Sequence, residues 1–477
     1  MLSFTMRYYS TRNKNESASF SKAALAGLAP DGGLYVPEEI PQYSQTVKSS
    51  LGTMSFIDIA YETIRPWVEG DIPGQVLQEM VHSAYPFTAP LVEAGDRLVL
   101  ELFHGPTAAF KDFGARFMAR AFSYLRRGED RPLKILVATS GDTGGAVADG
   151  FYSVEGIAVT VLYPKGRVSP LQEKQIAGLK GNISAIAVEG SFDDCQRLVK
   201  QAFSDEDLKN RLALSSANSI NISRLIPQAV YYAAAAGRAA ANLIDPDGEA
   251  TPRKRANEGG SLPPGSEAKL LRHPPQRGLA PATPPRFGAP IICVPSGNFG
   301  NLTAGLYAWK MGAPIAQFIA ATNVNKTVPD YLASGTYEAR LSRATLSNAM
   351  DVGAPSNFER MAAHFSWEEM RNLILGASVT DEETRNTILY VFTQHGYYLD
   401  PHSAVGWHAV DSLFNSGALK IEAPTVVLST AHPAKFAETV EPITGPVPIP
   451  PSLKIAMGRT AETRTIPVNL DALKECL

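Results

Sequence analysis

The sequence has few cysteines, no long apolar run and almost no net charge. Its three cysteines, Cys195, Cys293 and Cys476, show no metal-ligand spacing, and an odd, sparse count fits a reducing compartment better than a disulfide framework. No run of about 18 apolar residues is present, which argues against a transmembrane helix. A formal net charge of -3 gives no strong field for nucleic acid or a membrane surface. We therefore predict a cytoplasmic protein with no metal site, no nucleic acid partner and no membrane partner.

Apolar segments rich in valine and isoleucine alternate with helical patterns along the chain. The segment 134–139 (KILVAT) predicts a buried strand, and a glycine-rich turn and a helix follow it. Further strands are predicted at 157–163, 183–188, 291–294, 317–322 and 425–429. Strands that alternate with helices are typical of parallel sheets with both faces covered. With 477 residues, the chain is long enough for two or three α/β domains.

One segment, residues 244–289, interrupts this pattern. Between Ile244 and Pro290 the chain has ten prolines, charges of both signs and almost no large apolar side chains. Such a composition cannot bury enough surface to offset the entropy lost on ordering, so we predict a disordered surface insertion. Its basic run at 253–255 could bind an acidic partner, but a solvated loop is the simpler interpretation.

A lysine between aromatic residues is the first candidate for chemistry. In Glu101–Asp112 (ELFHGPTAAFKD), Lys111 follows Phe110, and Phe113 comes shortly after it. Apolar surroundings desolvate an ammonium group and lower its pKa, which makes the free amine available for Schiff-base formation. A single lysine beside aromatic residues is more often a surface residue with a buried stem, so this motif alone identifies only a candidate.

Two glycine-rich turns follow predicted strands. The first is Ala138–Ala146 (ATSGDTGGA) and the second is Val294–Gly305 (VPSGNFGNLTAG). Small residues let the backbone approach a ligand, and successive N–H groups at the start of a helix bind anions. Neither turn matches the dinucleotide or the P-loop fingerprint. Two such turns in one chain predict a site for two anions, such as a phosphorylated cofactor beside a carboxylated or phosphorylated substrate.

Three polar segments complete the set of candidates. Val426–Phe436 (VVLSTAHPAKF) places Thr430 at the end of a strand, where open α/β sheets bind ligands. Tyr163–Gln175 (YPKGRVSPLQEKQ) puts two cations before a predicted helix start, a favourable place for a dianion. Ser215–Arg224 (SSANSINISR) is polar enough to line a pocket. Taken singly, a hydroxyl bonded to its own turn and a solvated basic turn are the simpler explanations of the first two segments, and a capped loop explains the third equally well.

Together these motifs resemble the threonine synthase family. The matching segments also include YYSTRN at 8–13, DGGLYVPEEIP at 31–41, FIAATNVNKTVPDYL at 318–332 and TLSNAMDVGAPSN at 345–357. The similarity covers about residues 7–240 and 290–460, which is nearly everything except the predicted insertion. The combination of HGPT, FKD, SGDTG and TAHPAKF is specific, and it looks like the microbial and fungal branch of the family.

The resemblance implies an α/β fold, that of a two-domain fold-type-II pyridoxal-phosphate enzyme similar to tryptophan synthase β. An N-terminal extension domain is added in this branch. Residues 1–95 are then the N-terminal region, and residues 96–243 and 290–477 the catalytic α/β domains that clamp the cofactor pyridoxal 5'-phosphate.

The resemblance also implies a role for single residues. Lys111 is expected to form the Schiff base with the cofactor, and Thr430 to face its pyridine nitrogen. The expected phosphate cradle is Gly297, Asn298, Phe299 and Gly300. Residues expected at the substrate are Ser140, Asp142 and Thr143, with Lys165, Ser169, Asn218, Asn221 and Arg12 as weaker choices, the first two for the leaving phosphate. One departure is Asn301, where relatives often have Asp, so a charge-dependent role there is in doubt.

The implied reaction converts O-phosphohomoserine and water into threonine and phosphate, with Lys111 as the base for the Cα and Cβ protons. The implied partner is this small-molecule substrate, and the protein is expected to be a monomer or a small homo-oligomer. A serine/threonine dehydratase and an amino-acid phospholyase are the nearest alternatives; the cationic turn at 165–167 favours a phosphate leaving group. A non-catalytic cofactor-binding protein is a further alternative. It is disfavoured because the chain retains Lys111, SGDTG and Thr430.

Overall fold

The computed structural model describes residues 5–245, 253, 288–419 and 423–477. The predicted insertion, 244–289, lies outside the described residues except at positions 244, 245, 253, 288 and 289. Its disorder therefore stays a prediction.

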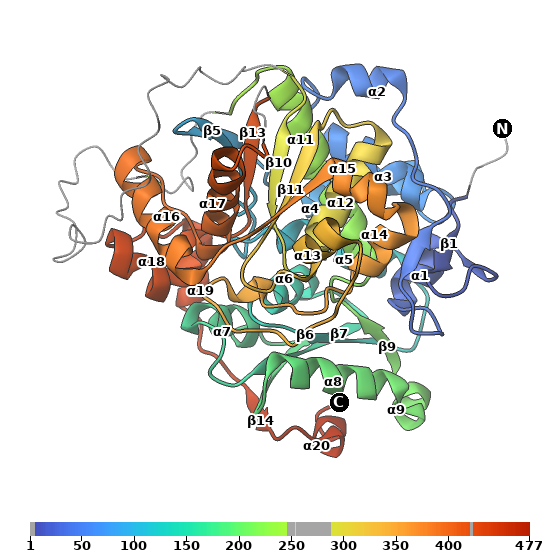
Figure 1. Ribbon diagram of the computed structural model, residues 1–477. Coiled ribbons are helices and arrows are strands. Elements are labelled where there is room, and N and C mark those ends of the chain that lie inside the picture. The colour runs from blue at the N-terminus through green and yellow to red at the C-terminus, as the bar shows by residue number, and fades with distance from the viewer. Residues whose placement is uncertain (1–4, 246–252, 254–287, 420–422) are drawn as a thin grey trace.

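Two sheets built on parallel strands form the body of the protein (Figure 1). The larger has six strands in the order β12-β11-β10-β13-β5-β4, and only the β4–β5 pair is antiparallel. The smaller has five parallel strands in the order β14-β8-β7-β6-β9. Their bounds are β4 Leu91–Ala94, β5 Arg97–Glu101, β6 Leu133–Ala138, β7 Ile157–Pro164, β8 Ile183–Val188, β9 Ala213–Ser216, β10 Ile291–Pro295, β11 Gln317–Thr322, β12 Ile374–Ser378, β13 Thr425–Ser429 and β14 Arg464–Ile466.

The predicted strands and their parallel pairing are confirmed. β10 (IICVP) and β13 (TVVLS) are buried along their whole length, because helices cover both faces of a parallel sheet. A separate three-stranded antiparallel sheet, β2-β1-β3, lies in the N-terminal region; its strands are β1 Tyr8–Ser10, β2 Ser17–Ala18 and β3 Tyr35–Pro37.

Helices surround both sheets, and α5 and α6 lie between the sheets in Figure 1. The helices are α1 Phe20–Ala26, α2 Gln45–Ser50, α3 Phe56–Val68, α4 Gly74–Ala84, α5 Lys111–Leu125, α6 Asp142–Phe151, α7 Pro170–Ala177, α8 Phe192–Ser204, α9 Glu206–Arg211, α10 Ile222–Leu225, α11 Ala229–Ala240, α12 Gly300–Met311, α13 Thr327–Ser334, α14 Phe358–His364, α15 Trp367–Leu373, α16 Asp381–His395, α17 Pro401–Asn415, α18 Ala437–Thr444, α19 Pro451–Met457 and α20 Leu470–Lys474. Within the described residues, no helix is both long enough and apolar enough to cross a membrane.

The chain crosses from one sheet to the other three times, between β5 and β6, between β9 and β10, and between β13 and β14. β5 precedes the smaller sheet in sequence but pairs with β13 of the larger one, and β14 returns near the C-terminus to pair with β8. β5 lies in the predicted segment 96–243 and β14 in the predicted segment 290–477, yet each strand pairs with a strand of the other segment. The domain boundaries therefore stay a prediction.

The N-terminal region packs on the helices of the larger sheet. Trp67 of α3 is fully buried and stacks on Tyr307 of α12, with ring centroids 5.4 Å apart. Phe113 of α5 packs edge-on against Tyr231 of α11, at a centroid distance of 5.2 Å. Burial of each such side chain stabilises the fold by about 1.5–3 kcal/mol, so the N-terminal region and α5 share one apolar core.

Candidate active site

Lys111 begins α5 at the carboxyl edge of the larger sheet. The backbone N–H of Phe110 donates to the carbonyl of Thr430 at 2.9 Å, which fixes the segment before Lys111 against the segment after β13. β10 and β13 are parallel neighbours, so the residues that follow them, Thr430 and the turn 297–300, share this edge. The fold thus brings three of the predicted motifs to one place.

A buried carboxylate joins two lysines at this edge. The Oδ2 atom of Asp142, in the first turn of α6, lies 3.5 Å from Nζ of Lys111, and its Oδ1 atom lies 2.7 Å from Nζ of Lys435. Gln172 donates its amide to the same Oδ1 at 2.9 Å. The side chain of Lys435 is 0% exposed, that of Asp142 3% and that of Lys111 14%.

The charged groups of this cluster shift one another's pKa values. Burial lowers the pKa of Lys111; Asp142 opposes that shift, while Lys435 and Arg224 add to it. Burial alone would raise the pKa of Asp142, but Lys435 and Lys111 outweigh it and hold the pKa below its ordinary value. The cluster therefore keeps Asp142 ionised and eases release of a proton from Lys111.

The turn 297–300 forms a close-packed cradle at the start of α12. A Cβ atom added at Gly297 would lie 2.7 Å from the carbonyl oxygen of Ala349. Phe299 has a φ of 58°, in the left-handed region. The amide of Asn298 donates to Oγ of Ser219 at 2.6 Å. Because glycine has no side chain, the backbone is left uncovered at the N-terminus of α12, a twelve-residue helix. The N–H groups at such a helix start attract anions.

The segment at the start of α17 supports this cradle. His402 accepts the backbone N–H of Ala349 on Nε2 at 3.2 Å, while its Nδ1 lies 2.6 Å from Oδ1 of Asp400. The ring proton is therefore on Nδ1. Oγ of Ser403 lies 3.1 Å from Oγ of Ser429, the residue before Thr430. This support was not predicted from the sequence, although DPHS at 400–403 carries an N-capping aspartate followed by proline, a helix-start pattern.

Several buried polar atoms around these motifs have no partner within the described part of the protein. They include Oδ1 of Asn218, Nε of Arg224 and Oδ1 of Asn348. Ser219 and Ala349 contact the turn 297–300. Asn218 comes directly before Ser219, and Asn348 comes directly before Ala349. Buried polar groups are nearly always hydrogen-bonded, so these atoms fit a polar, phosphorylated ligand.

Arg224 is a site residue that the sequence analysis quoted within a motif but did not assign. Its side chain is buried, its Nη1 donates to the carbonyl of Ala217 at 2.6 Å, and burial lowers its pKa to about 10. Among the described residues, no carboxylate lies within ion-pair distance of it. α10 lies against α5 so closely that a Cβ atom at Gly114 would come within 2.5 Å of the Arg224 carbonyl. Arg224 therefore brings a buried positive charge to the Lys111 side of the site, where the carboxylate of Asp112 acts on it without an ion-pair contact.

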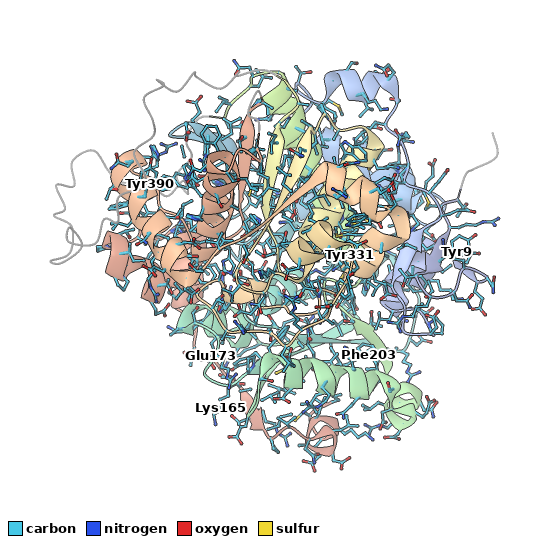
Figure 2. The ribbon with its side chains drawn as sticks, in the orientation of Figure 1. Tyr9, Lys165, Glu173, Phe203, Tyr331 and Tyr390 are labelled. Carbon is cyan, nitrogen blue, oxygen red and sulfur yellow. The ribbon has the colours of Figure 1, made fainter. Side chains whose placement is uncertain are left out.

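The weaker sequence candidates fall into two groups. Ser169 caps α7 and donates to the carbonyl of Lys435 at 3.2 Å, so it adjoins the cluster. Ser140 and Thr143 flank the start of α6 beside Asp142. Lys165 instead is 55% exposed, pairs with Glu189 at 3.1 Å, and lies at the lower left of the molecule in Figure 2.

Two further candidates, and Asn301, have their polar groups engaged with other parts of the protein. Asn221 is buried, and its amide donates to two backbone carbonyls while its oxygen accepts from Ser223, which leaves no hydrogen for a substrate. Arg12 is 55% exposed and pairs with Glu359 at 3.2 Å. Asn301 is buried, and its oxygen accepts from the hydroxyls of two tyrosines, at 2.6 and 2.7 Å, a role that needs no charge. The structure does not bring Lys165, Asn221 or Arg12 to Lys111 through any contact of the described residues.

Comparisons with known proteins give a consistent result. Residues 7–85 match the family model "Threonine synthase N terminus", and residues 403–477 match "Threonine synthase, C-terminal". The threonine synthase of Escherichia coli K12 is 39% identical over 474 residues, which cover 99% of both chains. The threonine synthase of Saccharomyces cerevisiae is 33% identical and covers 91% of this chain and 88% of its own.

Solved structures agree with these sequence matches. The crystal structure of threonine synthase from Escherichia coli superposes with a TM-score of 0.81, at 38% identity over 99% of both chains. The structure of PLP-bound threonine synthase from Brucella melitensis gives a TM-score of 0.81 at 35% identity, over 99% of this chain and 98% of its own. Diaminopropionate ammonia lyase from Escherichia coli shares the fold alone, with a TM-score of 0.51 at 14% identity over 84% of this chain and 95% of its own.

Proposed function

This chain belongs to the threonine synthase family, and from that premise we propose which of its residues carry out the reaction. Its function is that of a threonine synthase, a pyridoxal-phosphate-dependent lyase. Its fold is the fold-type-II α/β architecture with an N-terminal domain. The observation that carries the residue assignment is the contact of Asp142 with both Lys111 and Lys435 at the sheet edge that also holds the turn 297–300 and Thr430.

The cofactor fits the cradle and the residues around it. We assign Gly297, Asn298, Phe299 and Gly300 to its phosphate, because the glycine backbone is bared at the start of α12. Lys111 would hold the cofactor covalently, and Thr430 would offer a neutral hydroxyl to its ring nitrogen. When bound, the cofactor supplies an electron sink for the α-carbon of the substrate.

The residues of the chain then have separate tasks. Lys111, once displaced by the substrate amine, takes the protons from Cα and Cβ, and its lowered pKa favours the neutral amine that this step needs. The start of α6, with Ser140 and Thr143, faces the substrate carboxylate. Arg224 binds an anionic group of O-phosphohomoserine, since its buried Nε has no partner in the described protein. Phosphate leaves from Cγ, one proton returns to Cγ to make the methyl group, water adds its hydroxyl at Cβ and gives up its other proton to the phosphate, and a proton returns to Cα to give threonine.

The reaction itself is tested with purified holoenzyme and O-phosphohomoserine. We expect phosphate and threonine to be released in equal amounts, measured by a phosphate assay and by amino-acid chromatography. L-serine and L-threonine are expected to react poorly because neither carries a phosphate that can leave from Cγ. Formation of 2-oxobutyrate as the main product, or a preference for L-serine, would instead identify a dehydratase.

A substitution in the cradle tests the cofactor assignment. We expect Gly297→Ala to weaken cofactor binding by at least about tenfold, or about 1.4 kcal/mol, because its Cβ atom would lie 2.7 Å from the backbone of Ala349 and Met350. The measurement is titration of the apoenzyme with cofactor, followed by visible absorbance, alongside the thermal midpoint. Gly458→Ala is the control, since its Cβ atom would come no closer than 3.6 Å to another atom. Equal cofactor affinity in both variants would remove the 297–300 turn from the phosphate site.

Location and assembly follow the same reasoning. We propose that the protein works in the cytoplasm, which is supported by its three free cysteines, two of them buried. A small-molecule substrate is its partner. That it acts without nucleic acid or membrane, as a monomer or small homo-oligomer, remains part of the proposal.

A further inference from the structure

Lys435 is a buried cation for which the reaction as assigned has no task. It lies in the short 3-10 helix η4, Pro433–Phe436, just after Thr430. Its Nζ donates to the carbonyl of Thr107 at 2.8 Å and pairs with Asp142 at 2.7 Å. Burying an ammonium is costly unless a carboxylate compensates it. Two explanations remain: a purely structural ion pair, or a charge that the substrate site requires.

The position of Asp142 favours the second explanation. The same carboxylate contacts Lys111, so it lies where the substrate reacts. It also stands in the first turn of α6, a ten-residue helix whose N–H groups would otherwise attract an anion. An uncompensated carboxylate there would repel a substrate that carries both a carboxylate and a phosphate. Once Lys111 is engaged with the cofactor, Lys435 is the remaining cation in direct contact with Asp142 among the described residues.

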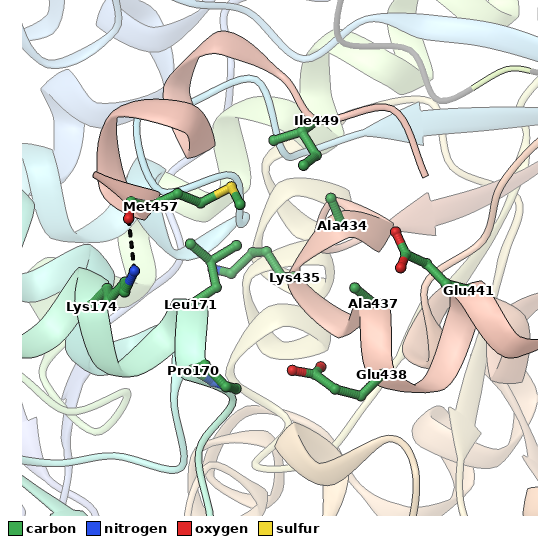
Figure 3. A pocket seen from close by; sticks show the side chains of 10 residues that line it. All are labelled: Pro170, Leu171, Lys174, Ala434, Lys435, Ala437, Glu438, Glu441, Ile449 and Met457. Atoms are coloured by element: carbon green, nitrogen blue, oxygen red, sulfur yellow. Dashed lines mark hydrogen bonds between the residues drawn. The ribbon is translucent and has the colours of Figure 1, made fainter. Parts of the chain in front are cut away.

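The surroundings of Lys435 show which carboxylate its ammonium group faces. A hollow of about 310 Å³ lies beside it, and Glu438 and Glu441 line that hollow. Figure 3 shows the Lys435 side chain extending toward Leu171 on α7, away from both glutamates. The Lys435 ammonium therefore compensates the charge of Asp142 and not that of Glu438 or Glu441.

We propose that Lys435 is a specificity-determining residue whose buried charge neutralises Asp142, so that the site around Lys111 accepts a phosphorylated, anionic substrate. Lys435 acts through Asp142 and does not itself contact the substrate. This inference rests on the proposed function.

The test is a double-mutant cycle on the holoenzyme with Lys435→Met, Asp142→Asn and the double variant. We expect Lys435→Met to raise KM for O-phosphohomoserine by at least about tenfold and to weaken competitive inhibition by inorganic phosphate equally. The visible absorbance of the bound cofactor should persist. In the Asp142→Asn background, the same Lys435 substitution should change KM by less than about threefold, because no charge is left to neutralise. Lys180→Met, which removes an exposed ion pair with Glu462, is the matched control.

The outcomes separate the explanations. A lower thermal midpoint in Lys435→Met with unchanged KM and phosphate inhibition would make the pair structural and overturn the proposal. An equal KM penalty with and without Asp142 would overturn it as well, since Lys435 would then act directly on the substrate. If Lys435→Met does not fold, the comparison of Asp142→Asn with the double variant still decides. A wild-type enzyme that releases no threonine would refute the proposed function, whereas binding of inorganic phosphate, measured by calorimetry, would still test the role of Lys435.

Discussion

Lys111→Ala is expected to fold like the wild type and to form no threonine. Lys111 is the lysine that begins α5 at the edge where the turn 297–300 and Thr430 meet. Loss of its amine removes both the covalent link to the cofactor and the base for the Cα and Cβ protons. We expect turnover to fall by at least about 10⁴-fold, since residues that act as one catalytic unit show losses of this size.

The measurement combines activity with spectroscopy. Purified Lys111→Ala should lack the visible absorbance of a lysine–cofactor imine, while its circular dichroism and thermal midpoint stay close to those of the wild type. The variant also loses a 3.5 Å ion pair with Asp142, but Lys435 still compensates that carboxylate at 2.7 Å. Lys200→Ala, at an exposed position of α8, is the control. Steady-state activity comparable to the wild type would show that another amine carries the reaction.

Arg224→Met is expected to lose substrate binding without losing stability. The guanidinium is buried and has an unpaired Nε, and no carboxylate that the structure describes forms an ion pair with it, although Asp112 acts on it from further away. Hydrogen bonds to charged groups are worth about 1.5–3 kcal/mol, so kcat/KM for O-phosphohomoserine should fall roughly 10- to 100-fold. Stability should hold, because methionine fills similar volume without the cost of a buried charge.

Two readouts decide what Arg224 binds. If Arg224 binds the substrate, KM rises while the cofactor titration stays unchanged. If it binds the cofactor phosphate, the cofactor titration shows a lower affinity. Arg120→Met is the control, since Arg120 is a partly buried arginine on α5 that donates to the carbonyl of Gly150. Unchanged kcat/KM together with a large fall in the thermal midpoint would mean that Arg224 only holds the 217–224 loop.

Most of the strand framework could be predicted from local pattern. Segments such as 157–163 and 183–188 are apolar because both faces of a parallel strand are buried, so their composition carries the signal. The order of the strands does not follow from such patterns. β5 and β14 each pair with strands far away in the sequence, and that choice depends on packing between distant segments.

The site divides in the same way. Lys111, Asp142, Thr430 and the turn 297–300 were predicted from motifs whose residue types suit a phosphorylated cofactor, and their roles stay a proposal. Lys165 looked equally suitable as a cation before a helix, yet its side chain is 55% exposed and paired with Glu189. A sequence lists charges but does not show which of them the fold removes from water.

By itself, the sequence determined the family, the alternation of strands and helices, and the motifs that meet at Lys111. Only the tertiary structure decided which charges act there. Arg224 and Lys435 are ordinary basic residues in sequence, and folding buries both of them, as it buries Arg360, whereas most other lysines and arginines that the structure describes keep contact with solvent. Burial removes the solvent that screens a charge, so the same side chain that is neutral to function on the surface becomes decisive beside Asp142 or Lys111. That distinction rests on contacts between segments hundreds of residues apart, which no local pattern records.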